Sequence, residues 1–110
     1  MRRPAAFLFS MAFASPAFAQ EALDLFTRSD KGHCIACHQL PDGVGPGTRN
    51  DVGPRLAGER ARALGKAELR AIIDDATKRN PDSVMPPYGR HRILDAREID
   101  RLTEFLHALP

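Results

Sequence analysis

Two cysteines and a histidine within five residues point most directly to chemistry in this 110-residue chain. Cys34, Cys37 and His38 form the pattern C-x-x-C-H, which is the attachment signature of c-type haem. The two thiols can add to the two vinyl groups of one porphyrin, and the histidine that follows then lies beneath the ring to bind the iron. We therefore predict one covalently attached haem c, with His38 as the proximal iron ligand.

Two other kinds of site also use a C-x-x-C pair. A thioredoxin-like redox pair needs a βαβ pattern, and no strand signal flanks Cys34. A zinc site needs two more ligands at conventional spacing, but the chain has no further cysteine, and His91 and His107 are too far apart in sequence for the usual pair. The sequence therefore favours haem.

A sixth iron ligand is expected from the second half of the chain. Met85 is the only methionine after Met11, and it lies in the proline-rich segment Val84-Met85-Pro86-Pro87. Histidine and methionine ligation raises the reduction potential and closes the position where a small molecule would bind, so Met85 as distal ligand predicts electron transfer. The other reading of Met85 is a side chain that fills a gap in the core.

The remaining histidines are the rival ligands. His33 directly precedes Cys34 and cannot easily reach over the ring, whereas His107 falls beside the apolar stripe of the last helix. His91 is close enough to Met85 in sequence to be an alternative or switch ligand. Arg90 and Arg92 flank it and could pair with haem propionates or an acidic partner, but solvated side chains are the favoured reading.

A tight glycine and proline segment could orient the proximal ligand. A ligating histidine usually donates its other ring N–H to a carbonyl or carboxylate oxygen. Pro54, in Gly53-Pro54-Arg55-Leu56, is a candidate for that carbonyl, and an ordinary turn proline is the alternative.

The first nineteen residues are typical of a secretory signal peptide. Met1-Arg2-Arg3 is positively charged, residues 5–13 are apolar apart from Ser10, and Ala17-Phe18-Ala19 is a small-x-small cleavage signal. The apolar run is too short to span a bilayer, which takes about 20 residues, so we expect cleavage and no membrane anchor afterwards; a retained membrane anchor is the alternative. Because haem c is attached outside the cytoplasm, the leader and the haem motif together predict a periplasmic protein.

The segment from residue 20 to 110 is expected to form one domain. Its basic and acidic residues balance at 14 each, which gives no electrostatic reason to bind nucleic acid or an anionic membrane. Valine, isoleucine, leucine and phenylalanine make up only about one-fifth of it, close to the level at which a chain struggles to bury a core. A haem would supply the missing apolar volume.

Three helices are predicted and no strand, which gives an all-α fold. The apolar spacing predicts helices over 22–29, 67–78 and about 96–109. The last helix has the clearest start, since Asp95 and Glu98 have the spacing of a capping box. Residues 41–58 and 80–92 are rich in glycine or proline and read as long irregular loops, which is reasonable if they wrap a group that is not protein.

These motifs together resemble the class I cytochromes c, whose small fold has three to four helices around one haem. The segments 32–41 and 80–94, which contain Cys34-Ile35-Ala36-Cys37-His38 and Met85-Pro86-Pro87-Tyr88-Gly89, are similar to SoxX, the monohaem subunit family of SoxAX cytochromes from sulfur-oxidising bacteria. The resemblance implies a heterodimer with a SoxA-like dihaem or monohaem cytochrome. It also implies Cys34 and Cys37 as haem thioethers, His38 as proximal ligand and Met85 as distal ligand.

The activity that the resemblance implies belongs to the whole complex, an L-cysteine S-thiosulfotransferase that loads thiosulfate onto the SoxYZ carrier. The bond-forming chemistry would belong to the SoxA-like partner, and this chain would pass electrons to a small soluble cytochrome c. One alternative is a diffusible cytochrome c that serves an oxidase or dehydrogenase. A second alternative is a haem-based sensor in which His91 or a gas replaces Met85.

Overall fold

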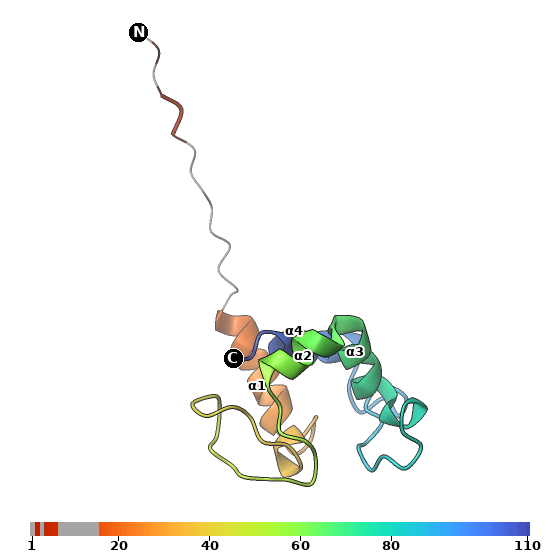
Figure 1. Cartoon of the computed structure of the whole chain (residues 1–110). Coiled ribbons are helices and arrows are strands. Elements are labelled where there is room, and N and C mark those ends of the chain that lie inside the picture. Colours follow the sequence, from red (N-terminus) through yellow and green to blue (C-terminus); the bar gives the residue numbers. More distant parts are fainter. Residues whose placement is uncertain (1, 3, 7–15) are drawn as a thin grey trace.

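The computed structural model describes residues 2, 4–6 and 16–110 (Figure 1). In those residues the chain forms α1 (Pro16–Thr27), η1 (Cys34–Ala36), α2 (Gly58–Leu64), α3 (Lys66–Asp75), η2 (Ala76–Lys78) and α4 (Ala96–His107), where η marks a short 3-10 helix. The described ranges contain no strand, so the all-α prediction is confirmed. None of the helices found in them is long and apolar enough to cross a membrane.

The last helix, α4, begins with the predicted capping box. The Glu98 backbone N–H donates to Asp95 Oδ1 over 2.8 Å, and the Asp95 N–H donates to Glu98 Oε1 over 3.1 Å. Leu94 and Ile99, on either side of this cap, are both 2% exposed. The predicted start is therefore confirmed, and the helix ends at residue 107, two residues before the predicted end.

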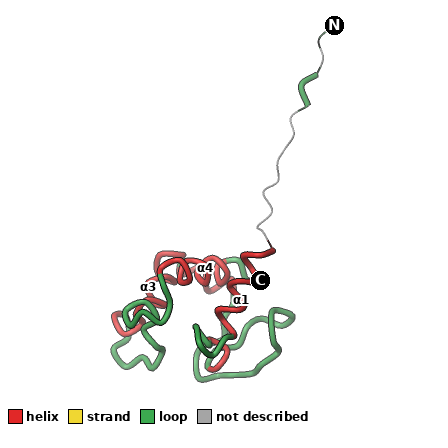
Figure 2. Tube along the Cα trace, turned by 180° about the vertical axis from the view of Figure 1, so that it is seen from behind, coloured by secondary structure: helices red, strands yellow, loops and turns green. Residues whose placement is uncertain are grey.

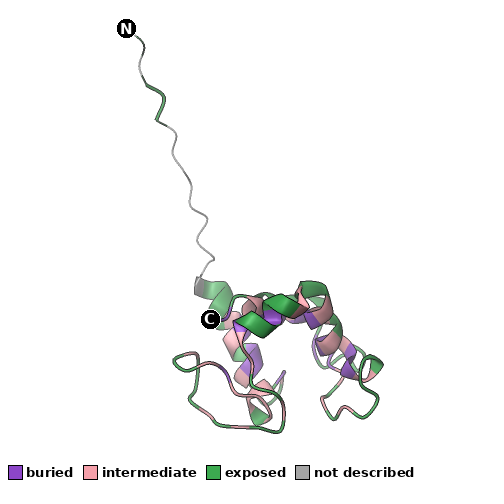
Figure 3. Ribbon diagram, viewed as in Figure 1, coloured by how far each residue is buried: buried purple, intermediate pink, exposed green. Residues whose placement is uncertain are grey.

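Helix α4 is the centre of the domain, because each of the other three α-helices packs against it. Phe26 of α1 and Phe105 of α4 bring their ring centroids to 6.2 Å. Figure 3 shows the buried residues along the inner sides of these helices. The core cluster consists of Leu25, Phe26, Leu40, Ile73, Tyr88, Leu94, Ile99, Leu102, Leu106 and Leu109.

Helix α1 covers residues 16–27 rather than the predicted 22–29. Its apolar face is as predicted, but the helix gains a turn at its start because Phe18 packs on α4, where the Arg101 guanidinium carbon lies 3.8 Å from the ring centroid. The helix therefore runs through the predicted cleavage point after Ala19. Most of the predicted leader, residues 1–19, lies outside the described residues.

Helix α2 was not predicted from the sequence. It is held by the end of the chain, since the Gly58 N–H donates to the Pro110 carbonyl over 3.0 Å and Arg62 Nη1 donates to the Leu109 carbonyl over 2.8 Å. Because these partners lie far along the chain, the sequence of residues 58–64 has no apolar pattern that would predict the helix. The helix predicted over 67–78, in contrast, is present as α3 and η2.

Two irregular segments leave the helices on the same side, as Figures 1 and 2 both show. One runs from η1 to the start of α2, and the other runs from η2 to the start of α4. Together with the helices above them, they form an arch. These are the two glycine- and proline-rich loops that the sequence predicted around a group that is not protein.

Candidate functional site

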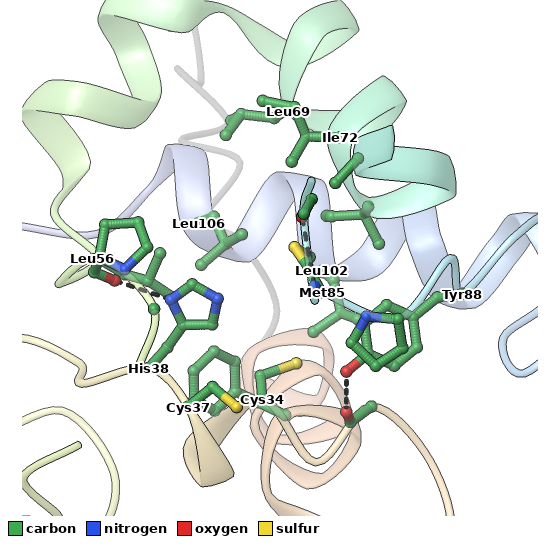
Figure 4. A pocket seen from close by; sticks show the side chains of 18 of the residues that line it. Cys34, Cys37, His38, Leu56, Leu69, Ile72, Met85, Tyr88, Leu102 and Leu106 are labelled. Atoms are coloured by element: carbon green, nitrogen blue, oxygen red, sulfur yellow. Dashed lines mark hydrogen bonds between the residues drawn. The ribbon is translucent and has the colours of Figure 1, made fainter. Parts of the chain in front are cut away.

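A cavity of about 740 Å³ lies inside the arch, within the range of about 300–1,000 Å³ that is usual for ligand and cofactor sites. Residues 32–57 form one side, which we call the proximal wall, and residues 79–94 form the other, which we call the distal wall. The cavity is lined by the five residues that the sequence singled out, Cys34, Cys37, His38, Pro54 and Met85. Apolar side chains of the helices close its inner end, among them Leu69, Ile72, Leu102 and Leu106 (Figure 4).

The turn η1 brings the two thiols and the histidine to one side of the chain. His33, at its start, adopts a left-handed conformation with φ 48°, and the N–H groups of Cys37 and His38 both donate to the Cys34 carbonyl, over 3.2 and 2.8 Å. Both thiols are free in the described structure. Burial raises the pKa of the Cys34 thiol to about 12, opposite in direction to the lowered pKa of a reactive redox cysteine, and the described residues contain no strand for the βαβ unit of a thioredoxin-like site.

His38 is oriented by the segment that the sequence pointed to. Its Nδ1 lies 2.7 Å from the Pro54 carbonyl oxygen. Because a carbonyl can only accept a hydrogen bond, Nδ1 carries the proton, and in the neutral imidazole Nε2 then keeps a free lone pair for a metal. Two backbone hydrogen bonds hold the loop segment that carries Pro54. One runs from Gly53 N–H to the Cys37 carbonyl over 2.7 Å, and the other runs from Leu56 N–H to the Gln39 carbonyl over 2.9 Å.

Gly53 lies so close to His38 that no side chain fits between them. A Cβ atom at Gly53 would be 2.5–2.9 Å from three atoms of the His38 ring, shorter than real Cβ contacts. The imidazole is therefore packed against the backbone on one side and faces the cavity on the other (Figure 4).

Met85 reaches the same cavity from the distal wall, and Figure 4 shows its sulfur on the far side of the space from the His38 ring. The side chain is half-buried, and its backbone N–H donates to Ser83 Oγ over 3.3 Å. Met85 lines the cavity and also packs against the core cluster, so its position is compatible with a ligand and with a gap-filling side chain. An imidazole nitrogen, a thioether sulfur and two free thiols around one apolar cavity fit the donor set of a covalently bound haem.

Comparison with known protein families decides the family. A family model described as cytochrome c oxidase, cbb3-type, subunit III matches residues 18–106. The chain belongs to this family of c-type cytochromes. Membership implies a covalent haem c, which agrees with the free thiols of Cys34 and Cys37.

The cytochrome c fold is also found in a solved structure. The crystal structure of SoxXA from P. pantotrophus matches with a TM-score of 0.66 and 22% sequence identity, over 82% of this chain and 80% of that chain. At this level of identity the likeness shows the fold. No curated protein matches the cytochrome by sequence.

The rival histidine ligands are placed differently around the cytochrome's cavity. His33 lines the cavity on the proximal side, next to Cys34. His91 is exposed, and neither His91 nor His107 is among the residues that line the cavity. His91 could therefore replace Met85 only if the distal wall moved.

The arginines near Met85 are also turned away from the cavity. Arg90 Nη1 lies 3.3 Å from the buried carboxylate of Asp75, and Arg92 is exposed. The Arg90 side chain is still 63% exposed, which agrees with the expectation of a solvated side chain. The cationic residues that do line the cavity are Lys31, Arg55, Arg60 and Arg79.

Sequence reasoning missed two residues that shape the site of this cytochrome. Asp75 anchors the distal wall through Arg90, and Tyr88 donates a hydrogen bond to the Gly32 carbonyl across the two walls. Tyr88 is the only tyrosine of the chain and lies in the Met85 loop, a signal that could have drawn attention to it. For Asp75 the helical pattern gave no signal, because its partner lies on another segment.

Proposed function

We propose that this chain is a periplasmic electron-transfer cytochrome that acts as the SoxX-like subunit of a thiosulfate-oxidising SoxAX complex. The observation that carries the electron-transfer role is the convergence of Cys34, Cys37, His38 and Met85 on one cavity. The SoxX role draws on the resemblance of the Met85 loop and on the fold that the chain shares with SoxXA. The leader sequence supports export.

The residues have distinct tasks in this proposal. Cys34 and Cys37 would hold the haem covalently, and His38 would bind the iron through Nε2, with Nδ1 fixed by the Pro54 carbonyl. Met85 would take the sixth position and so exclude small molecules. When bound, haem c supplies a single iron centre that gains or loses one electron.

The cavity opens to the surface where an electron partner can approach. Val52 of the proximal wall and Val84 of the distal wall both line the cavity, yet they are 67% and 84% exposed. Electron transfer needs the two redox groups to come close without bond formation, and apolar side chains at the opening lose little hydration free energy on contact. In the proposed complex the partner would be SoxA-like, SoxYZ would be the carrier, and a small cytochrome c would take the electron onward.

The ligand set is tested by comparing Met85→Ala with Val84→Ala, its exposed neighbour. Met85→Ala should keep its haem, lose the sulfur-to-iron charge-transfer band of the oxidised protein, show a lower reduction potential and bind carbon monoxide when reduced. Val84→Ala should resemble the wild type in all four measurements. A Met85→Ala protein with the wild-type spectrum and potential would refute the ligand role.

The SoxX role is tested by partner capture and reduction. The tagged cytochrome, produced beside a SoxA-like protein, should elute as a heterodimer, and thiosulfate with SoxYZ should reduce its haem only in that complex. Elution as a monomer, with no thiosulfate-dependent reduction, would contradict the SoxX role and leave the cytochrome role intact.

A diffusible cytochrome that serves a terminal oxidase is the second candidate. The family match to a cbb3-type oxidase subunit favours it. Under this candidate, the purified monomer should be oxidised by an oxidase-containing membrane fraction at the same rate whether or not a SoxA-like protein is present.

A further inference from the structure

Tyr88 connects the two walls of the cavity by a single buried hydrogen bond. Its Oη donates to the carbonyl oxygen of Gly32 over 2.5 Å, between residues 56 positions apart in the sequence. The tyrosine is 7% exposed and belongs to the core cluster. Figure 4 shows this bond below the ring of Tyr88, on the cavity side of the distal wall.

On the distal side, Tyr88 also closes the loop that follows it. Its carbonyl oxygen accepts hydrogen bonds from the N–H groups of Ile93 and Leu94, over 2.9 and 3.0 Å. Met85 is only three residues before Tyr88 in the chain, and Pro86 and Pro87 lie between them. Prolines fix φ, so this short and stiff connection holds Met85 at a nearly fixed position relative to Tyr88.

On the proximal side, the acceptor is fixed as firmly. The Gly32 N–H donates to the Leu25 carbonyl of α1 over 3.1 Å. A Cβ atom at Gly32 would be 2.8 Å from the Leu25 carbonyl oxygen and 3.0 Å from Cys34 Sγ, so the backbone is packed on both sides. The Gly32 carbonyl is thus a rigid point two residues before Cys34.

We propose that Tyr88 is a positioning residue, whose hydroxyl holds the Met85 segment against the segment that carries Cys34 and thereby keeps Met85 on the haem iron. This rests on the proposed ligand role of Met85. Loss of the hydroxyl leaves the buried Gly32 carbonyl without its partner, which favours states in which the distal wall moves away. Burial also raises the pKa of Tyr88 to about 12, so the hydroxyl keeps its proton well above neutral pH.

The test is imidazole binding to the oxidised holoprotein, because imidazole can reach the iron only when Met85 has left it. Tyr88→Phe removes one oxygen atom and keeps the ring. The expected result is imidazole affinity increased by about three- to tenfold, as the net contribution of one hydrogen bond implies, with a weaker sulfur-to-iron band at intermediate imidazole concentrations.

The matched control is Arg62→Gln. Arg62 also links distant segments through a hydrogen bond from a side chain to a backbone carbonyl, but it does not line the cavity. This variant should lower thermal stability without a change in imidazole affinity. A similar increase in both variants would overturn the proposal, because general loosening would then explain the effect.

The remaining outcomes separate this proposal from the proposed function. If the wild type has the sulfur-to-iron band and Tyr88→Phe binds imidazole as the wild type does, the positioning role fails and the ligand role of Met85 stands. If the wild type lacks the band, both fail together. If Tyr88→Phe does not retain haem while Arg62→Gln does, the bond serves assembly rather than ligand retention, and the positioning role is again overturned.

Discussion

The proximal wall and the distal wall face each other across one cavity, but they are held by different partners. In the proximal wall most hydrogen bonds run within the wall, as from Gly53 N–H to the Cys37 carbonyl and from the Asn50 side chain to the Ile35 carbonyl, and the Gly32 N–H makes its backbone link to a helix by donating to the Leu25 carbonyl. The distal wall also has internal hydrogen bonds, as from the Ile93 N–H to the Tyr88 carbonyl, but its middle is bonded to a helix as well, because the N–H groups of Gly89 and Arg90 both donate to the Asp74 carbonyl of α3, over 3.1 and 3.2 Å.

This difference separates two ways of building a ligand site. Beyond the link at Gly32, the proximal side is made by one stretch of chain that folds on itself, so most of its geometry depends on local turns and on the group it encloses. The distal side is tied to the helical frame at the end of α3, through the Asp74 carbonyl and the Asp75 carboxylate. We therefore expect the proximal wall to depend more on the haem than the distal wall does.

Of the changes considered, loss of the haem should have the largest effect, and it should show the difference between the two walls most clearly. A Cys34→Ala/Cys37→Ala chain cannot attach haem, and it should lose most of its helical circular dichroism and its cooperative thermal transition. The reason is that a cavity of about 740 Å³ would remain between walls that the small apolar core cannot bring together. Any residual protection in hydrogen exchange should lie at the Gly89 and Arg90 amides rather than at Gly53.

The wild-type cytochrome with its haem attached is the reference for these measurements. A haem-free chain that melts cooperatively near the holoprotein temperature would contradict the expectation. Protection confined to the proximal wall would reverse the comparison between the walls.

The same difference explains what could be predicted from the sequence. The C-x-x-C-H turn and the contact of His38 with the Pro54 carbonyl lie within one stretch of chain, so residue types and spacing offered Pro54 as a candidate for that contact, beside an ordinary turn proline. The cap of α4 was predicted for the same reason. Helix α2 was missed, because it depends on contacts of Gly58 and Arg62 with the end of the chain.

The anchors of the distal wall were missed for a similar reason. The sequence predicted where Met85 lies in the chain and that its loop is irregular, but the partners of that loop are set by where α3 ends. Asp75 reads as one more charged residue on a helix until the fold brings Arg90 beside it. The first turn of α1 likewise required Arg101 of α4, which no local pattern could supply.

Gly53→Ala should produce an intermediate effect, confined to the proximal wall. The added Cβ would fall 2.5–2.9 Å from the His38 ring, so the ring must move away from the Pro54 carbonyl or the turn must shift. Overpacking of this kind costs about 1–3 kcal/mol. We expect a decrease of that size in the free energy of unfolding of the holoprotein, measured with denaturant, together with a changed reduction potential.

Gly47→Ala is the matched control, because it lies in the same wall with nothing within 4 Å of the added Cβ. It should leave stability and potential close to those of the wild type. Equal effects of the two substitutions would mean that the proximal wall is loose enough to absorb a methyl group beside His38.

Asp75→Asn should have the smallest effect, and it tests the anchor of the distal wall. Hydrogen bonds from Thr77, and then the nearby Arg90 guanidinium, hold the pKa of the Asp75 carboxyl below its usual range. A carboxyl whose pKa is lower in the folded state stabilises the fold above its unfolded pKa of about 3.9, and this stabilisation is lost as the pH falls through the lower, folded value. The thermal midpoint of Asp75→Asn should thus lie below that of the wild type at pH 7, and the gap should close as the pH falls below about 4.

The loss in Asp75→Asn is limited because the amide oxygen of asparagine can still accept a hydrogen bond from Thr77. Asp51→Asn, at an exposed carboxyl of the proximal wall, serves as the control and should leave the midpoint unchanged across this pH range. If the gap for Asp75→Asn stays constant down to pH 3, the carboxylate charge contributes nothing to the anchor. The backbone bonds from Gly89 and Arg90 to Asp74 would then be what holds the distal wall to α3.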